Sequence, residues 1–413
     1  MLKIATIIVT GYNSLMEPEK RFLDVDPDVI KLGFVSFLTD ISSESIFSVF
    51  SIFFTVIVGA SASLLGLVEG FADFSASSLD YFVGWLSDKS GKRKNLALTG
   101  YGFSTLAKVT LLLSSSVTAL ASFRIIERLG KSFRGPPRDA WLSAVAEEGN
   151  RGYAFGLHKA MDKAGAVLGP LVAYFLLLYL GTTSGTFRII FIIAVIGAAL
   201  AVVVLSLMKD RPGVPHEREN IFKAWGTLSR GFKLFLIPAG IFSLAYFSFS
   251  FLLLRAYTLG LAVRDVVLLY ALFNISFVIF SVPIGKLGDW VGRKYIVILG
   301  YIIYFIMSLG FIFVRAKWEV IVLFLLFGLF YTIDEAQGKA FIADIEQDRR
   351  ATAMGMYNFV TGLIYLPASL IAGLLWVFNP IFAFVFAAAT TLLAMSVFIF
   401  LNTKILAKKI IKI

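Results

Sequence analysis

The chain has 413 residues, of which 58% are apolar and 16% are charged, and its mean hydropathy is +0.84. Soluble domains carry about 25% charged residues, so this composition excludes an ordinary soluble protein. Cysteine is absent, which excludes disulfide frameworks and thiolate metal sites. Histidine occurs only as His158 and His216, which argues against a metal centre built on histidines. In a membrane protein a net charge of +11 reflects the orientation of the loops, so we expect no nucleic-acid partner.

Apolar runs recur along the whole chain, and each is long enough to cross about 30 Å of hydrocarbon. The large number of Phe residues, 41, favours lipid-facing helices over a β-barrel. The runs therefore predict an all-α integral membrane protein with twelve transmembrane helices. The predicted spans are 30–58, 63–87, 95–114, 117–144, 153–180, 186–208, 233–254, 265–287, 295–314, 318–344, 352–377 and 379–402.

The polar segments between these spans predict the domain organisation. The longest of them contains Pro212, Gly213 and Pro215 together with a cluster of charges, which is typical of a linker. We expect the natural chain to start at either Met1 or Met16. The predicted segments are a cytosolic lead-in (1–28), a first half (29–208), a cytosolic linker (209–232), a second half (233–403) and a cytosolic basic tail (404–413).

Basic residues are distributed unevenly between the two sides of the predicted membrane. Most Lys and Arg lie before the first span, in the loops that follow even-numbered spans, and in the tail. The opposite side holds Arg188, Arg255, Arg264, Arg315 and Lys317. Because cytosolic loops are enriched in Lys and Arg, this bias predicts a multi-pass protein of the cell membrane with both termini in the cytosol.

Two pairs of similar segments indicate an internal repeat. Gly84-Trp-Leu-Ser-Asp-Lys-Ser-Gly-Lys-Arg-Lys94 closes span two, and Gly285-Lys-Leu-Gly-Asp-Trp-Val-Gly-Arg-Lys294 closes span eight. Farther along, Arg151-Gly-Tyr-Ala-Phe-Gly156 is similar to Arg350-Ala-Thr-Ala-Met-Gly355. The repeats predict two pseudo-symmetric six-helix halves, as in many transporters.

The first pair of segments resembles the loop motif of the major facilitator superfamily, Gly-x-Leu-x-Asp-x-x-Gly followed by two basic residues. Its first glycine is expected to permit close helix approach and its second glycine to form a tight turn. The resemblance implies that the aspartate helps to latch the two halves by facing a helix N-terminus. The motif residues are Gly84, Asp88, Gly91 and Arg93, and Gly285, Asp289, Gly292 and Arg293.

Two further resemblances to the superfamily lie on spans four and five. On span four, Arg124 followed by Pro136 resembles a motif that the family uses in proton handling. Span five carries Gly156, Gly165, Gly169 and Pro170, which resemble the signature of superfamily antiporters and imply export. Gly165 and Gly169 share one helical stripe, so we expect another helix to pack closely there, with a bend permitted at Pro170.

The predicted spans of the first half hold many charged residues, which are costly at bilayer depth unless they are paired or functional. Structural pairing is one explanation, since the numbers of acidic and basic groups match. The acidic members are Asp40, Glu44, Glu69, Asp73, Asp80, Glu127, Asp139 and Asp162, and the basic members are Lys108, Arg124, Arg128, Lys131, Arg134, Arg138, Lys159 and Lys163.

The resemblance implies that spans one, four, seven and ten line a central cavity. Asp40 and Glu44 share one face of span one, so we expect either to exchange a proton for a pairing to span four. The predicted proton-coupling residues are Asp40, Glu44, Glu69 and Asp73. The predicted substrate-binding residues are Arg128, Lys131, Tyr246, Phe249, Tyr331, Asp334 and Glu335, and Glu335 is expected to pair with Lys339.

The leading hypothesis is a monomeric secondary transporter that exports a small organic or amphipathic compound in exchange for protons, without a cofactor or metal. Its expected partners are the substrate, protons and the lipid bilayer. Three alternatives stay open at this point. They are a transporter of a lipid or lipid-linked anion that uses Arg128 and Lys131, a divalent-cation exporter that uses carboxylates, and an intramembrane enzyme that uses Asp40 and Glu44.

Overall fold

The computed structural model describes residues 25–113, 116–146, 151–210, 225–346 and 349–410. Most of the predicted lead-in, including both Met1 and Met16, therefore lies outside the described residues. The same is true of most of the predicted linker and of the last three residues of the predicted tail.

Four helices of the first half begin directly after a residue whose side chain caps the helix N-terminus. Asp26, Ser61, Ser116 and Thr183 each accept a hydrogen bond from a backbone N–H in the first turn of the helix that follows. The helices of this half are α2 (Pro27–Ile52, continued by the π-helical turn η2, Phe53–Ile57), α3 (Ala62–Ser90), α4 (Arg93–Leu113), α5 (Val117–Val145), α6 (Arg151–Leu180) and α7 (Ser184–Leu207).

The second half follows a short 3-10 turn, η3 (Trp225–Thr227), and contains two interrupted spans. Its elements are α9 (Arg230–Ala245), α10 (Ser250–Thr258), α11 (Val263–Val291), α12 (Arg293–Phe313), α13 (Lys317–Thr332), the π-helical turn η4 (Ile333–Gly338), α14 (Lys339–Ile345), α15 (Arg350–Phe378) and α16 (Pro380–Ile410).

The predicted all-α membrane fold is confirmed. Twelve helical spans are present in the described part of the chain when α9 with α10, and α13 with α14, are each counted as one. Nine of the described helices are long and apolar enough to cross a membrane. The helices α3 and α5 are not among the nine because they carry many of the charged residues, and α13 has only 16 residues before η4 begins.

The structure differs from the sequence prediction in span seven, which was expected to be continuous. The helix stops after Ala245 and restarts at Ser250. Side chains from two other helices satisfy the backbone groups that the break exposes. The Tyr304 hydroxyl donates to the Ala245 carbonyl oxygen (2.8 Å), and the Ser248 N–H donates to Ser369 Oγ (3.0 Å).

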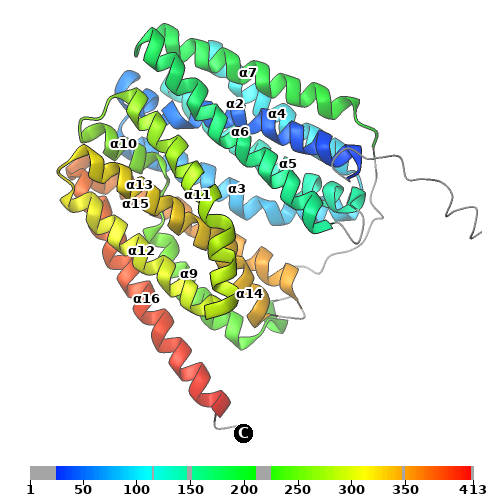
Figure 1. Cartoon of the computed structure of the whole chain (residues 1–413), viewed down its shortest axis with the longest axis vertical. Coiled ribbons are helices and arrows are strands. Elements are labelled where there is room, and N and C mark those ends of the chain that lie inside the picture. The colour runs from blue at the N-terminus through cyan, green and yellow to red at the C-terminus, as the bar shows by residue number, and fades with distance from the viewer. Residues whose placement is uncertain (1–24, 114–115, 147–150, 211–224, 347–348, 411–413) are drawn as a thin grey trace, which may run out of the picture.

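The two halves lie side by side, with α2–α7 toward the upper right and α9–α16 toward the left and lower part of Figure 1. We call the end of the bundle with the turns at Gly91 and Gly292 the motif end, and the end with the turns at Gly59, Gly181 and Gly260 the opposite end. From the opposite end, near α10, the halves spread apart toward the motif end, near α14. Across the halves, α3 packs along α15 and α6 packs along α11.

Glycine allows the backbones of α3 and α15 to touch. A Cβ added at Gly66 would lie 2.3 Å from the Ser369 carbonyl oxygen, and one added at Gly373 would lie 2.5 Å from the Ala62 carbonyl oxygen. A Cβ at Gly362 would lie 2.5 Å from Ser78 Oγ. Small residues therefore bring the two halves together along this seam, as is typical of helix packing in membranes.

Candidate functional site

The charged residues of the first half form a connected network, and Glu69 with Arg124 is its strongest pair. Arg124 Nε donates to Glu69 Oε1 and Arg124 Nη2 donates to Glu69 Oε2, both at 2.9 Å. The Glu69 side chain is 0% exposed and that of Arg124 is 4% exposed. Such a two-bond arrangement fixes both side chains in a single orientation.

Glu127 connects this pair to α4 and α2. Its carboxylate lies 3.6 Å from Arg124 and 4.0 Å from Arg134, and it accepts a hydrogen bond from the Ser43 hydroxyl (3.2 Å). Ser43 in turn accepts from the ammonium group of Lys108 (2.9 Å), which also donates to Ser42 (2.8 Å). The Lys108 side chain is fully buried, so protein groups and not water must stabilise its charge, and Ser42, Ser43 and nearby carboxylates do so.

Asp73 and Arg128 form a looser pair with partly exposed side chains. Asp73 Oδ1 lies 3.6 Å from Arg128 Nη2. The Arg128 guanidinium also lies 5.7 Å from the ring centroid of Phe47, a cation–π contact. Arg128 therefore pairs with α3 instead of α2.

The expected pairing of Asp40 or Glu44 with span four is absent. Glu44 accepts a hydrogen bond from the hydroxyl of Tyr270, which belongs to the second half. No hydrogen bond or ion pair joins Asp40 to another side chain in the described part of the chain. Asp40 and Glu44 do not pair with the arginines of α5 because Arg124 and Arg128 reach toward the carboxylates of α3.

Asp40 nevertheless lies among charges from three helices. Glu44 on its own helix, Lys131 on α5, and Asp162 and Lys163 on α6 all act on its carboxylate electrostatically. Asp162 is held by Lys159 (3.4 Å), whereas the Lys163 ammonium lies 4.5 Å from the ring centroid of Phe277 in the second half. Asp40 is therefore a half-buried carboxylate without a direct partner among charges of both signs.

Lys131 has a similar position on α5. Its side chain is exposed, and in the described residues it forms no ion pair within 4 Å. The carboxylates that act on it belong to α2 and α3, among them Asp40, Glu44 and Asp80. Lys131 is therefore an exposed cation with carboxylates of α2 and α3 nearby.

The second half contributes a smaller charged group on the π-helical turn η4. The predicted pair of Glu335 and Lys339 is confirmed, with 2.9 Å between Oε1 and Nζ. Two cations of the first half, Lys159 and Lys163, also act on Glu335 across the interface. Asp334 is half-buried and acts on the phenol of Tyr246 and on neighbouring tyrosines.

The predicted aromatic residues have different positions. Tyr246 contacts the rings of second-half residues such as Phe330 and Tyr365, with centroids 5.8 and 5.6 Å away. Tyr331 contacts Phe277 at 5.3 Å and is half-buried. Phe249 packs between the halves, 4.7 Å from Phe273 and 6.4 Å from Phe47 of the first half. Phe249 therefore belongs to the contact that joins the halves.

The loop motif forms two turns at the motif end. Gly91 and Gly292 have φ angles of 65° and 101°, which side-chain-bearing residues rarely adopt. Arg293 donates to Asp289 (3.3 Å), to Asp344 (2.7 Å) and to the Ala340 carbonyl oxygen, and so ties α12 to α14.

The remaining motif residues fit the expectation to different degrees. Arg93 is the first residue of α4, and Gly84 and Asp88 are buried near the end of α3. The expectation of close helix approach is wrong for Gly285, because an added Cβ there would meet no atom within 4 Å.

Span five packs as its glycines predict. A Cβ at Gly165 would lie 2.4 Å from the Phe37 carbonyl oxygen, and one at Gly169 would lie 2.7 Å from the Ile41 carbonyl oxygen. Both carbonyl groups belong to α2, so α2 and α6 are in backbone contact beside Asp40. Pro170 lies inside α6 directly after this contact.

Comparison with known families agrees with this architecture. The family model described as Major Facilitator Superfamily matches residues 32–333 and 239–411. The chain belongs to the major facilitator superfamily. This major facilitator protein is therefore a transporter and not an enzyme, so the hypothesis of an intramembrane enzyme that uses Asp40 and Glu44 is not supported.

Relatives of this major facilitator protein are found in archaea and bacteria. An uncharacterised MFS-type transporter of Methanocaldococcus jannaschii is 36% identical over 388 residues, which are 92% of this chain and 96% of that protein. The multidrug resistance protein MdtH of Escherichia coli (O1:K1 / APEC) is 29% identical over 160 residues, which are 39% of this chain and 37% of MdtH.

Solved structures share the major facilitator fold at low identity. The nucleoside transporter NupG matches with a TM-score of 0.71 and 13% identity, covering 91% of this chain and 98% of NupG. The peptide transporter POT in complex with sulfate matches with a TM-score of 0.73 and 14% identity, covering 94% and 96% of the two chains.

Several site residues carried little or no signal in the sequence. Tyr270, Ser248 and Ser250 contact carboxylates of the first half, yet aromatic and hydroxyl residues are ordinary in membrane helices. Lys108 and Glu127 were visible as charges inside spans, but nothing local assigned their partners. In the described part of the chain, no group of three or more His, Cys, Asp or Glu residues is placed to hold a metal ion.

Proposed function

We propose that this major facilitator protein exports a small organic or amphipathic compound in exchange for protons, as a monomer in the cell membrane with both termini in the cytosol. The observation that carries the proposal is the position of Asp40. It is a half-buried carboxylate in the middle of α2 that forms no hydrogen bond or ion pair with another side chain in the described residues, whereas the carboxylates of Glu69 and Asp73 on α3 are paired with arginines. A carboxylate that is not already neutralised by a cation is free to bind and release a proton.

The proposed cycle uses the two-state rocking of the halves. A proton that binds Asp40 changes the charge balance around Lys131 and Lys163, and this favours the state that opens to the motif end. Substrate enters when the proton leaves, so the two ligands bind alternately. The partial similarity to the multidrug resistance protein MdtH supports export over import.

Within this scheme the other predicted residues have supporting roles. Glu44, Glu69 and Asp73 hold the charge network in place through Tyr270, Arg124 and Arg128. The substrate contacts proposed in the first half are Arg128 and Lys131, and those in the second half are Tyr246, Phe249, Tyr331, Asp334 and Glu335. These residues offer a charged wall and an aromatic wall to an amphipathic molecule.

Purified protein in liposomes tests the coupling. Asp40→Asn should abolish flux driven by an imposed pH gradient but leave substrate exchange without a gradient measurable. Asp265→Asn is the matched control, since the Asp265 side chain is half-exposed in the first turn of α11 and pairs only with Arg264 in the described residues. Gradient-driven flux that is unchanged in Asp40→Asn would reject the assignment of the proton site.

Transport of a lipid or lipid-linked anion is a second candidate, which is supported by the exposed ammonium group of Lys131, since it has no ion pair in the part of the chain that the structure describes. In that case Lys131→Gln should abolish transport of an anionic lipid while a neutral amphipathic compound is unaffected. Flux of fluorescent lipids and of a neutral dye into the same liposomes would distinguish the two candidates.

A further inference from the structure

Toward the opposite end of the bundle, side chains of the two halves contact each other, and we call this set of contacts the closure. Phe47 of α2 contacts Phe249 and Tyr270 of the second half, with ring centroids 6.4 and 5.4 Å apart. Beside these rings Arg124 lies 4.4 Å from the centroid of Phe47. The closure therefore combines apolar rings with a buried charge network.

Two carboxylates of the first half reach the other half here: Glu44 accepts from the Tyr270 hydroxyl, and Glu69 accepts from two serines of the second half. The Glu69 carboxylate accepts four hydrogen bonds: two from Arg124, one from Ser248 Oγ (3.0 Å) and one from Ser250 Oγ (3.0 Å). The Arg124 donors belong to the same half as Glu69, whereas both hydroxyl groups belong to the second half. Ser250 is fully buried and Ser248 is 5% exposed, so water does not replace either bond in this state.

The break between α9 and α10 holds both hydroxyl groups in position. The Ser248 N–H donates to Ser369 Oγ (3.0 Å), and the Ser250 N–H donates to Ser248 Oγ (3.3 Å). Ser248 Oγ thus accepts one bond and uses its own hydrogen for Glu69. In a continuous helix these N–H groups would bond to the preceding turn instead. The break in the helix and the contact of the two serine hydroxyls with Glu69 therefore form one arrangement of hydrogen bonds.

We infer that Glu69, Ser248 and Ser250 form a latch that closes the opposite end, and that the two hydroxyl groups are the part that separates when this end opens. The inference rests on the rocking of the halves in the proposed function. Arg124 and Glu69 lie in one half and move together, so their ion pair persists. Ser248 and Ser250 move away with the second half, and water then hydrates the carboxylate.

This difference makes the latch sensitive to loss of the hydroxyl groups. In the closed state a missing hydroxyl leaves the buried carboxylate with fewer donors, because water is excluded. In the open state water supplies the missing bonds, so the same substitution has little effect there. The variant Ser248→Ala/Ser250→Ala should therefore shift the equilibrium toward opening of the opposite end by about tenfold.

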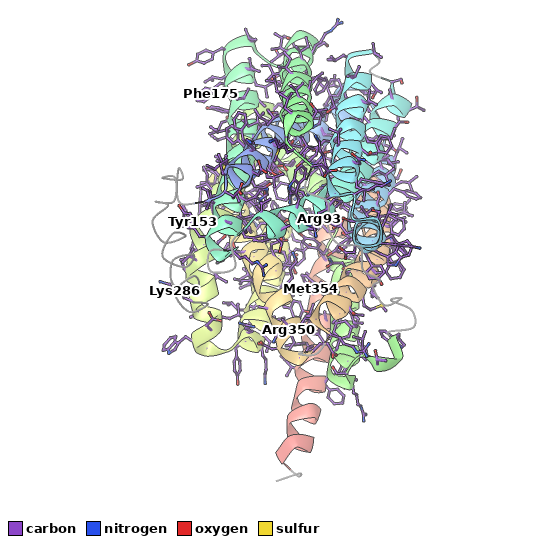
Figure 2. The ribbon with its side chains drawn as sticks, turned by 90° about the vertical axis from the view of Figure 1, so that its right-hand side faces the viewer. Arg93, Tyr153, Phe175, Lys286, Arg350 and Met354 are labelled. Atoms are coloured by element: carbon purple, nitrogen blue, oxygen red, sulfur yellow. The ribbon has the colours of Figure 1, made fainter. Side chains whose placement is uncertain are left out.

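Distances between spin labels measure this shift directly, and the chain contains no cysteine that would interfere with labelling. One label pair, Thr182→Cys with Arg264→Cys, reports on the opposite end. Another pair, Tyr153→Cys with Lys286→Cys, reports on the motif end. Figure 2 shows Tyr153 and Lys286 on facing helices of the two halves at that end. In the double serine variant the first distance should lengthen and the second should shorten.

Ser243→Ala is the matched control, because among the described residues the buried Ser243 hydroxyl of α9 bonds only to the Ala239 carbonyl oxygen of its own helix. The single variants Ser248→Ala and Ser250→Ala each keep one hydroxyl and should give intermediate shifts, even if the double variant folds poorly. Distances equal to those of the natural protein in the double variant, or in both single variants, would overturn the latch. So would an equal shift in Ser243→Ala.

The experiment needs neither substrate nor a pH gradient, so it separates the latch from the proposed function. Shifted distances together with pH-independent flux would refute proton coupling alone. Unchanged distances together with intact proton coupling would refute the latch alone.

Discussion

Gly165→Ala is expected to destabilise the first half by pushing α2 away from α6. The added Cβ would lie 2.4 Å from the Phe37 carbonyl oxygen and 3.1 Å from Cβ of Asp40, whereas ordinary contacts begin at 3.4 Å. The helices must therefore separate by about 1 Å, and overpacking of this kind costs about 1–3 kcal/mol. Because Asp40 lies at the point of contact, the substitution should also impair proton-driven flux.

Thermal unfolding of the purified protein, followed by tryptophan fluorescence, measures the effect. Gly156→Ala is the control on the same helix, because no atom lies within 4 Å of the Cβ that it adds. Replacing a helical glycine by alanine in open space should stabilise by about 0.5–1 kcal/mol. Gly165→Ala should thus lower the Tm, and Gly156→Ala should leave it unchanged or raise it. Equal changes in both variants would refute the argument from close packing.

Four further variants test this contact and other parts of the bundle. Gly169→Leu should stop the transport cycle, and transport at the natural rate would show that α2 and α6 do not pack closely there. Lys108→Met should lower stability by about 1–3 kcal/mol in thermal unfolding, since Ser42 and Ser43 lose a buried donor. Lys31→Met, at a half-exposed pair, should change stability by under about 1 kcal/mol. Gly91→Ala should lower stability by about 1–2 kcal/mol because alanine is strained at φ 65°, and an unchanged Tm would contradict this.

The sequence predicted the features of the fold that depend on neighbouring residues. Apolar runs located the spans, and the motif glycines located the turns at Gly91 and Gly292. The break in span seven was not predictable, because the segment from Tyr246 to Phe249 contains neither proline nor glycine. Distant side chains, Tyr304 and Ser369, stabilise that break, and only the folded bundle brings them to it.

The candidate site was predictable as a set of charges but not as a set of pairs. Charged residues stand out inside apolar spans, so Glu69 and Arg124 were visible from the sequence. Their pairing depends on how α3 and α5 are rotated, which helical periodicity does not determine. The spacing of Glu335 and Lys339 fixed their pair in advance because both lie on one helical segment, four residues apart.

The two halves repeat each other in their turns but differ in the side chains that they pack together. Acidic and basic side chains gather on α2, α3 and α5, whereas rings gather on α9, α11 and α13. Under the proposed function, an amphipathic substrate bound between the halves would have one favoured orientation, with its polar head toward the first repeat and its hydrocarbon toward the second. A photoreactive group at the polar end of such a molecule would then label the first repeat, and one at the hydrocarbon end would label the second. The labelled repeat therefore reports how the molecule is oriented when it is bound.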